Sequence, residues 1–331
     1  MKKSIYIFSG GEIKRKQNTL YFETEDGDKK YLPIEAVSEI FIFGEVSINK
    51  KLLEYLTQKE ILLHFFNYHE YYVGTYYPRE HYNSGLIILK QAENYLDNKK
   101  RLVLAKKFVE GAVKNILKVI AYYKNRGVDL DVVEKEINNL FLSLNKRNSV
   151  EEIMAVEGNV RDVYYTAFDK IINNSDFSFE QRSRRPPANR LNALISFGNS
   201  LLYVLVLSEI YRTHLDPRIG YLHSTNMRRF TLNLDVAEIF KPILVDRLIF
   251  TILNKKIIKK SHFKNELGGI FLKENGQKIF LQEWEKRLQT TIKHRGLGRN
   301  VSYKRLIRLE LYKLEKHILE DEEYKPFVAR W

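Results

Sequence analysis

The chain has 331 residues, of which 44% are hydrophobic and 13% aromatic; this predicts about two globular domains and excludes a mainly disordered chain. It contains no cysteine, which excludes disulfides, thiolate zinc sites and cysteine nucleophiles and suits a reducing compartment. Lys and Arg number 55 against 41 acidic residues, a net charge of +14. Such an excess favours a polyanionic partner, most simply nucleic acid, although a generally basic proteome would give the same balance.

No segment has the pattern of a leader or a membrane span. The apolar stretch near the start covers only Ile5 to Phe8, which is too short for a signal peptide. The most apolar segment, Leu191 to Ile210, is interrupted by two asparagines, a serine and a glutamate, and therefore predicts a buried helix. We expect a soluble, cytoplasmic protein.

The first 80 residues predict a small β domain. Short runs rich in β-branched and aromatic residues are separated by turn signals such as Gly10-Gly11 and Gly27. This pattern is typical of a small sandwich or barrel, and one helical pattern interrupts it at Asn49 to Lys59. The predicted strands cover residues 4–8, 12–16, 19–23, 29–32, 39–43, 61–66 and 71–77.

From about Leu86 the hydrophobic pattern becomes helical, with apolar residues at i, i+3 and i+4. Residues 269–281 interrupt it with a predicted hairpin around Asn275-Gly276. We therefore expect an α+β fold, with a small N-terminal β-sandwich-like domain over residues 1–85 and a larger, mostly α-helical domain over residues 86–331. The predicted helices cover residues 102–121, 132–144, 149–172, 191–213, 234–254, 281–291 and 302–320.

Several common catalytic motifs are absent from the sequence. It has no G-x-x-x-x-G-K-[ST] loop, no G-x-S-x-G and no H-E-x-x-H, which disfavours P-loop ATP chemistry, the commoner hydrolases and zinc proteases. Gly296-Leu297-Gly298 is only a fragment of a dinucleotide fingerprint, and no predicted strand precedes it.

The residues that could carry chemistry are acidic residues and a histidine of the helical domain. Asp235 and Glu238 are three positions apart in an apolar helical pattern, so both carboxylates project from one face. Carboxylates on a buried helix need a partner, since an unpaired charge there costs several kcal/mol. A divalent cation would meet that need, and so would salt bridges to Arg228, Arg229 or Lys241, which are the simpler alternative.

Three further residues stand out. Asp246 is eleven residues beyond Asp235, about 16 Å along a helix, too far to share one ion, and it is predicted to pair with an arginine. Glu157 lies in an otherwise apolar turn before Gly158, whose small size suggests close approach of another group or a helix-packing contact. His223 follows a turn at Asp216-Pro217, although most histidines are surface or core residues.

These residues resemble the motifs of the CRISPR-associated Cas1 family, the endonuclease and integrase subunit of spacer acquisition. The resemblance covers nearly the whole chain, with its motifs in the family's order. The matching segments are Glu157-Gly158 with Arg161 and Tyr164-Tyr165 for the first acidic motif, Arg185 to Tyr203, Leu215 to His223 for the histidine motif, Leu234 to Arg247 for the last acidic motif, and Gly10 to Leu20.

The resemblance implies an N-terminal β domain, a C-terminal α domain and a homodimer. It also implies a catalytic divalent metal held by Glu157, His223 and Glu238, with Asp235 beside the metal as a further catalytic acidic group. In many relatives the last ligand is Asp, and Glu238 is one methylene longer. Two carboxylates and one imidazole suit Mn²⁺ or Mg²⁺, and zinc is also compatible with these ligand types.

The implied reaction is insertion of prespacer DNA into a CRISPR array by attack of a 3′-OH on a phosphodiester, and attack by water would give a nuclease. One phosphodiester replaces another, in keeping with the missing P-loop. The implied partners are double-stranded DNA, as prespacer and CRISPR repeat, and a Cas2 dimer in a larger integrase complex.

Two other functions remain as alternatives. One is a non-catalytic DNA-binding scaffold subunit of a recombination complex, whose carboxylates are ion-paired. The other is a mononuclear metal oxygenase, which is disfavoured because its usual set of two histidines and one carboxylate does not match these motifs.

Basic residues that could contact DNA phosphates form several clusters in the helical domain. Each cluster could equally be a solvated face. The cluster at Arg184 and Arg185, which precedes the long apolar helix, also includes Arg182 and Arg190. The main candidates are Arg184, Arg185, Arg228, Arg229, Lys259, Lys260, Arg295 and Arg299.

Overall fold

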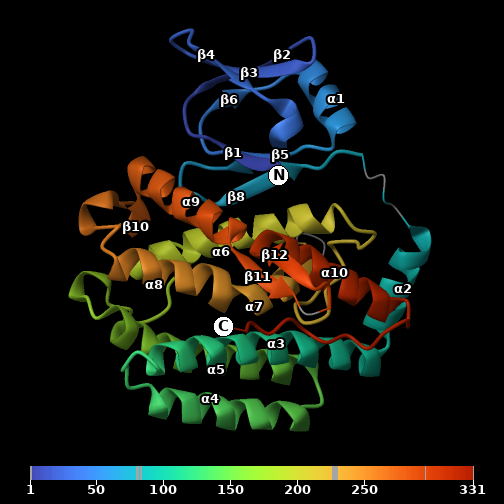
Figure 1. The fold of residues 1–331 in the computed structure, drawn as a ribbon, viewed down its shortest axis with the longest axis vertical. Helices are drawn as coiled ribbons and strands as arrows, with labels where there is room; N and C mark the ends of the chain where they lie inside the picture. The colour runs from blue at the N-terminus through green and yellow to red at the C-terminus, as the bar shows by residue number, and fades with distance from the viewer. Residues whose placement is uncertain (1, 80–81, 83, 226–229, 295, 331) are drawn as a thin grey trace. The chain divides into compact units, whose positions relative to one another are not determined.

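The structure is a computed structural model that describes residues 2–79, 82, 84–225, 230–294 and 296–330. The chain divides into two compact units, Met1–Asn83 and Ser84–Trp331 (Figure 1). The first unit consists mainly of strands and the second mainly of helices. The predicted α+β fold is therefore confirmed.

Two four-stranded sheets form the first unit, with the strand orders β1-β5-β7-β8 and β4-β3-β2-β6. In the first sheet β1, β5 and β7 run parallel, and β8 is antiparallel to β7. The chain passes from β5 to its parallel neighbour β7 through β6 and helix α1, and such a crossover is what parallel pairing requires. The bounds are β1 (Lys3–Ile7), β2 (Gly11–Lys16), β3 (Thr19–Thr24), β4 (Lys29–Leu32), β5 (Val37–Ile42), β6 (Val46–Ser47), α1 (Lys50–Lys59), β7 (Leu62–Phe66) and β8 (Tyr72–Tyr76).

Both sheets and α1 contribute to one apolar core. Ile13 and Leu20 from the second sheet, Ile40 from the first, and Leu52 and Leu56 from α1 are completely buried. Strand β5 is buried along its whole length, which agrees with its place between parallel neighbours. The apolar run Ile40-Phe41-Ile42 therefore comes from a strand that is buried on both faces.

The second unit packs its helices around α3 and α6. Helix α3 contacts α5 and α7, and α6 contacts α7 and α10; α4 packs against both α5 and α3 and lies below them in the view of Figure 1. The bounds are α2 (Gly85–Leu96), α3 (Asn98–Lys124), α4 (Asp131–Ser143), α5 (Val150–Ile172), α6 (Arg190–Ile210), α7 (Leu232–Lys241), α8 (Arg247–Asn254), α9 (Glu274–Gln289) and α10 (Tyr303–Ile318).

The hairpin expected over residues 269–281 is wrong in its position. Strand β10 (Gly269–Leu272) pairs with the preceding strand β9 (Phe263–Glu266), and the turn lies at Leu267 and Gly268, with φ angles of 48° and 74°. Positive φ at both turn residues is the geometry of a tight hairpin. Residues 274–281 belong to α9 instead, so the Asn275-Gly276 pair begins a helix.

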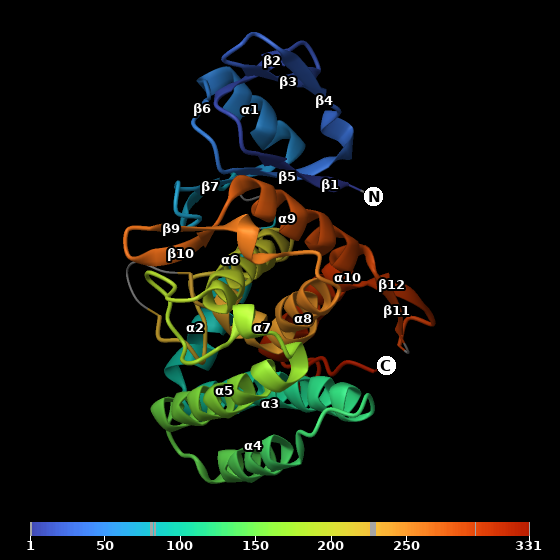
Figure 2. The ribbon, with the colours of Figure 1, turned by 90° about the vertical axis from the view of Figure 1, so that its left-hand side faces the viewer.

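A second hairpin has no counterpart among the sequence predictions. Strands β11 (Thr291–His294) and β12 (Arg299–Ser302) pair antiparallel, and Figure 2 shows this hairpin and β9–β10 on opposite sides of the unit. The segment between the two strands contains two glycines and one apolar residue, Leu297, so the sequence offers little apolar alternation there.

Helix α6 is long and apolar enough to cross a membrane by length and composition, but 78% of its most apolar stretch is buried inside the structure. Leu194, Ile195, Leu202 and Val206 are completely inaccessible. This agrees with the prediction of a buried core helix.

Beyond α10 the chain passes back along α3. The Asn115 side chain of α3 donates to the Phe327 carbonyl at 3.0 Å and accepts from the Ala329 N–H at 2.8 Å. The same amide donates to the Ile239 carbonyl of α7 at 2.9 Å, and the Phe327 ring stacks on Phe240 of α7 with 5.7 Å between centroids. Asn115 thus connects the C-terminal segment with α7.

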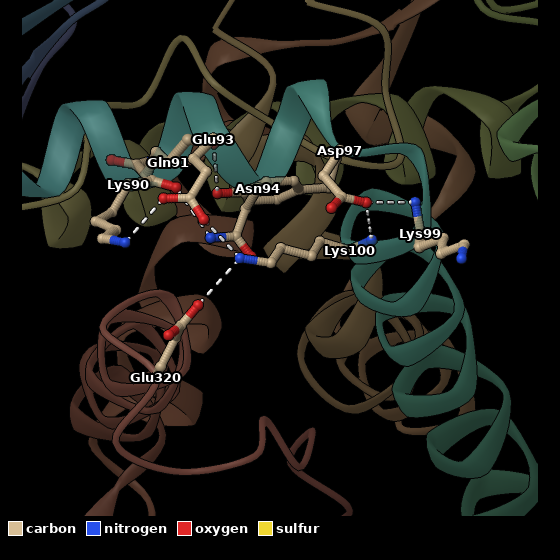
Figure 3. A network of polar contacts seen from close by, with 9 residues as sticks. Lys90, Gln91, Glu93, Asn94, Asp97, Lys99, Lys100 and Glu320 are labelled. Atoms are coloured by element: carbon tan, nitrogen blue, oxygen red, sulfur yellow. Dashed lines mark hydrogen bonds and ion pairs between the residues drawn. The ribbon is translucent and has the colours of Figure 1, made fainter.

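Asp97 fixes the junction between α2 and α3 (Figure 3). Its carboxylate accepts from the backbone N–H groups of Lys99 at 2.8 Å and Lys100 at 3.1 Å, which caps α3. The Lys100 ammonium pairs with Glu93 of α2 at 2.6 Å and with Glu320 beyond α10 at 3.0 Å. Exposed pairs of this kind contribute about 0–1 kcal/mol each, so the buried contacts must supply most of the stability of this junction.

Candidate functional site

Helix α7 carries Asp235 and Glu238 of the last acidic motif, and both carboxylates are buried. Pro242 follows it and has no N–H to donate to the Glu238 carbonyl, so the helix continues as a π-helical turn over Pro242–Asp246 before α8 begins. Arg287 of α9 donates from Nε to the Ile243 carbonyl in this turn at 3.1 Å. Single π turns inside helices occur frequently at functional sites.

Asp235 organises the histidine motif. Its carboxylate accepts the backbone N–H groups of Tyr221 at 2.5 Å, Leu222 at 3.0 Å and His223 at 2.9 Å. It also contacts Nδ1 of His223 at 2.8 Å. Because these four contacts use the lone pairs of both oxygens, we interpret Asp235 as the residue that orients His223.

The contact with Asp235 also determines which ring nitrogen of His223 faces a ligand. Nδ1 is engaged by the carboxylate, so Nε2 is the nitrogen that remains for binding. The side chain keeps 28% of its surface exposed. Burial would lower the pKa of His223, but the hydrogen bond to Asp235 and its charge raise it above the ordinary value.

Helices α2 and α3 hold the turn that carries His223. The Gln91 amide bonds both backbone groups of Asp216, accepting from the N–H at 2.7 Å and donating to the carbonyl at 3.2 Å. Arg101 donates from Nε to the Tyr221 carbonyl at 3.0 Å. The position of the histidine therefore depends on residues more than 100 positions away in the chain.

Arg161 of α5 lies at the centre of three carboxylates. Its guanidinium is 3.2 Å from Asp246, 3.4 Å from Glu238 and 3.6 Å from Glu157. The prediction that Asp246 pairs with an arginine is thus confirmed. Burial raises the pKa of Asp246 to about 6, although Arg161 acts against that rise.

Glu157 and Glu238 come together although they are far apart in sequence, because both carboxyl groups lie against the Arg161 guanidinium. Burial and the negative charge of Glu238 raise the pKa of Glu157 to about 7. Burial would also raise the pKa of Glu238, but the charges of Lys241, Arg161 and His223 lower it to about 2. Two carboxyl groups this close either share a proton or need a cation between them.

Lys241 is a member of this cluster that the sequence analysis considered only as a salt-bridge partner. Its ammonium contacts Glu238 and lies 5.1 Å from the centroid of the Tyr203 ring. Burial would lower the pKa of Lys241, but the charge of Glu238 holds it well above its usual range. The signal in the sequence is the i, i+3 spacing from Glu238 on an apolar helix.

Gly158 does not provide the close approach that its size suggested. Around the place where its Cβ would lie, no atom of the described residues comes within 4 Å. The expectation of a contact at Gly158, either a neighbouring group or a packed helix, is therefore wrong. The side of α5 beside Glu157 is open, and the Glu157 side chain keeps 23% of its surface exposed.

The donor set has the chemistry of a divalent-cation site, although it is not arranged around one. Across residues 2–79, 82, 84–225, 230–294 and 296–330, no three acidic or histidine side chains are grouped so that they could hold a metal ion. Glu238 instead pairs with Lys241 and Arg161. The paired carboxyl groups and the carboxylate-oriented imidazole nevertheless fit a metal, provided that Glu238 exchanges a cationic partner for the ion.

The predicted DNA contacts lie on the surface wherever the structure describes them. Lys260 is 64% exposed at its side chain and is 3.7 Å from Asp176. Such exposure suits DNA contact and a solvated face equally, so these roles stay predictions. The exposed candidates are Arg184, Arg185, Lys259, Lys260 and Arg299, whereas Arg228, Arg229 and Arg295 lie outside the described residues.

Known proteins share this chain's sequence and fold. A family model described as CRISPR associated protein Cas1 matches residues 5–286. A CRISPR-associated endonuclease Cas1 from Thermodesulfovibrio yellowstonii is 61% identical over 331 residues, covering 100% of both chains. The solved structure of a CAS1 protein from Thermotoga maritima is 46% identical, covers 98% of this chain and 100% of its own, and has a TM-score of 0.90. A casposase bound to its integration product shares the fold at 20% identity, with a TM-score of 0.89 and coverage of 99% and 94%.

Proposed function

Because the chain belongs to the CRISPR-associated Cas1 family, we propose that it is a DNA endonuclease and integrase that inserts prespacer DNA into a CRISPR array. The observation that carries the proposal is the meeting of Glu157 and Glu238 at Arg161, in a cluster whose histidine is oriented by Asp235. These residues lie in the three segments that resemble the family's motifs. The relative from Thermodesulfovibrio yellowstonii is named an endonuclease.

The proposed cofactor is Mn²⁺ or Mg²⁺, with Glu157, Glu238 and Nε2 of His223 as its ligands. Bound there, such an ion polarises a phosphoryl oxygen and stabilises the charge that develops on the attacking and leaving oxygens. Carboxylate oxygens suit both metals, and the single imidazole favours Mn²⁺.

The other residues of the cluster prepare the site for a phosphodiester. Asp235 fixes the orientation of the His223 ring. Arg161 holds Glu157 and Glu238 against each other. Lys241 keeps its charge at neutral pH because its pKa is raised, and an ammonium released from Glu238 can neutralise a non-bridging oxygen of the substrate.

In the proposed reaction a DNA 3′-OH attacks a phosphodiester of the repeat. A new P–O bond forms as the bond to the leaving 3′ oxygen breaks; the attacking hydroxyl gives up its proton and the leaving oxygen gains one. The number of phosphodiesters is unchanged, so the reaction requires no nucleotide hydrolysis. Where water attacks instead, the product is cleaved DNA.

We also propose that the protein acts in the cytoplasm as a homodimer on double-stranded DNA, together with a Cas2 dimer. The support is the family to which the chain belongs and the positive charge of the chain, +14. The exposed basic residues of the second unit are the proposed contacts to DNA phosphates.

A strand-transfer assay tests the proposed function. A short labelled duplex with free 3′ ends is incubated with a supercoiled plasmid that carries the repeat, the small partner subunit, and either Mn²⁺ or EDTA. We expect joining that requires Mn²⁺ and that falls by at least about 100-fold in His223→Ala and Glu157→Gln. The matched control is His214→Ala, because the His214 side chain is 47% exposed and pairs with Glu315, outside the candidate cluster; it should join DNA at the wild-type rate.

The outcomes separate the integrase from a non-catalytic scaffold. An integrase loses joining in these variants while its DNA affinity stays within about threefold, because the mutated groups act on the reaction. If the folded wild-type protein binds DNA but joins nothing with Mn²⁺ or with Mg²⁺, the protein is better explained as a scaffold. The carboxylates then serve as ion-pair residues.

A further inference from the structure

Arg182 is a cationic side chain whose hydrogen-bond partners are all neutral. It lies between α5 and α6 and donates from Nη1 to the Asn192 side-chain oxygen at 2.9 Å and from Nη2 to the Ser196 hydroxyl at 3.1 Å. It also contacts the Ser183 carbonyl and the Tyr165 hydroxyl. No carboxylate of the described residues comes within ion-pair distance of this guanidinium.

A partly buried cation without a counter-charge is costly. Burial lowers the pKa of Arg182, and the charge of Arg184 lowers it further. Arg190, eight residues later, shows the other arrangement: its guanidinium is 3.9 Å from the Asp176 carboxylate and donates to the Asp176 carbonyl at 2.8 Å. The same stretch of chain therefore contains one satisfied arginine and one that lacks an anion.

Arg182 also lies on the helical faces that carry the candidate site. Its partner Ser196 and Tyr203 are seven residues apart on α6, so they share one face, about 10 Å apart along the axis. Tyr203 stacks against the Lys241 ammonium. Tyr165, the other neighbour of Arg182, follows Arg161 by one turn of α5.

We propose that Arg182 binds a backbone phosphate of the DNA strand, flanking the phosphodiester that reacts at Glu157, Glu238 and Lys241. Four of the five N–H groups of the guanidinium meet neutral partners, which hold it in place without neutralising it, and one N–H remains to donate to a phosphate oxygen. The position of this subsite rests on the proposed function.

DNA affinity measured in EDTA tests the subsite without any reaction. Fluorescence anisotropy with a labelled duplex is recorded for the wild type, Arg182→Gln and the control Arg15→Gln. We expect Arg182→Gln to bind about tenfold more weakly and the slope of log affinity against log salt to become shallower by about 0.7–0.9, the value for one lost phosphate contact. Arg15→Gln should change neither quantity, since Arg15 is an exposed arginine of the first unit that lies against Tyr55 and is not among the candidate DNA contacts.

Thermal unfolding separates this role from a structural one. Gln keeps hydrogen-bonding capacity toward Asn192 and Ser196 and removes the uncompensated charge, so the Tm of Arg182→Gln should be equal to or above that of the wild type. If Arg182 serves only to join α6 to the preceding segment, Tm falls and the salt slope is unchanged, and the proposal is wrong.

A duplex series with single neutral methylphosphonates locates the contact. At one position the substitution should weaken wild-type binding about tenfold and have no further effect on Arg182→Gln. If every position acts equally on both proteins, Arg182 does not bind a defined phosphate. Failure of the wild type to join DNA, with this pattern intact, would overturn the integrase proposal and leave the phosphate subsite standing.

Discussion

Arg161, Lys241 and three carboxylates share one small buried volume, and their charges do not balance. Two cations face Glu157, Glu238 and Asp246, which leaves one excess negative charge if all three carboxylates ionise. The raised pKa of Glu157, about 7, offsets this excess with a proton. The same excess of negative charge would attract a divalent ion. Glu157 would then have to release its proton, because a carboxyl group must be deprotonated to bind a metal.

Asp235→Asn tests the orienting role that we assign to this carboxylate. Asn offers one acceptor oxygen and an NH₂ group in place of two acceptor oxygens, so at least one backbone N–H of the histidine motif loses its partner. We expect unfolding free energy to fall by about 1–3 kcal/mol and strand transfer to fall about 10- to 100-fold, with DNA affinity within about threefold. Urea unfolding and the joining assay measure these changes.

The matched control for Asp235→Asn is Asp176→Asn. The Asp176 side chain is 49% exposed and pairs with Arg190 and Lys260 at the surface, so its loss should cost less than about 1 kcal/mol. An Asp235→Asn protein with wild-type stability and wild-type joining would show that the four contacts to this carboxylate are dispensable.

Two glycines inside long helices differ in what surrounds them. A Cβ on Gly111 of α3 would lie 2.7 Å from the Pro326 Cβ of the C-terminal segment and 3.1 Å from the Ile239 side chain of α7. A Cβ on Gly158 of α5 would meet nothing described within 4 Å. Gly111 therefore lets the C-terminal segment pass close to α3, one turn before Asn115 ties that segment to α7.

Gly111→Ala and Gly158→Ala should change stability in opposite directions. In an open helix interior Ala is favoured over Gly by about 1 kcal/mol, and Gly158→Ala should gain that amount. Gly111→Ala should instead lose about 1–3 kcal/mol, because the added methyl overpacks the contact with Pro326. Chemical unfolding of both variants beside the wild type measures the difference. A stabilised Gly111→Ala protein would mean that the C-terminal segment does not pack against α3 in solution.

The positive charge of the molecule is carried by one of its two units. Residues 1–83 contain 11 basic and 12 acidic residues, whereas residues 84–331 contain 44 basic and 29 acidic residues. The unit that contains the candidate site is therefore the one with the electrostatic character of a nucleic-acid-binding domain.

Paired lysine substitutions in the two units test this division. Lys259→Gln with Lys260→Gln removes two exposed charges from the second unit, and Lys29→Gln with Lys30→Gln removes two exposed charges from the first. We expect the first double variant to make the slope of log affinity against log salt shallower by up to about 1.8, at about 0.9 per phosphate contact. The second should leave the slope unchanged. Equal effects of the two double variants would indicate that net charge alone governs binding.

Hydrophobic periodicity and short motifs were enough to place most elements and to select the acidic and histidine motifs. The strands of the first unit, the long helices and the buried character of α6 follow from local patterns, because side-chain spacing reports directly which face of an element is covered. Local signals misled at Asn275-Gly276, where the turn pattern gave way to α9, and at Gly158, whose surroundings are open.

The partners of the charged groups depend on the assembled fold. Arg161 meets Glu238 across 77 residues and Asp246 across 85, and Arg182 meets no carboxylate of the described residues although Asp176 lies only six positions away. The strength of a charge pair varies with separation and burial, and neither quantity can be obtained from spacing along the chain. Residue types and their order therefore suffice to suggest the chemistry, whereas packing determines which cations are neutralised and which remain to bind an anion.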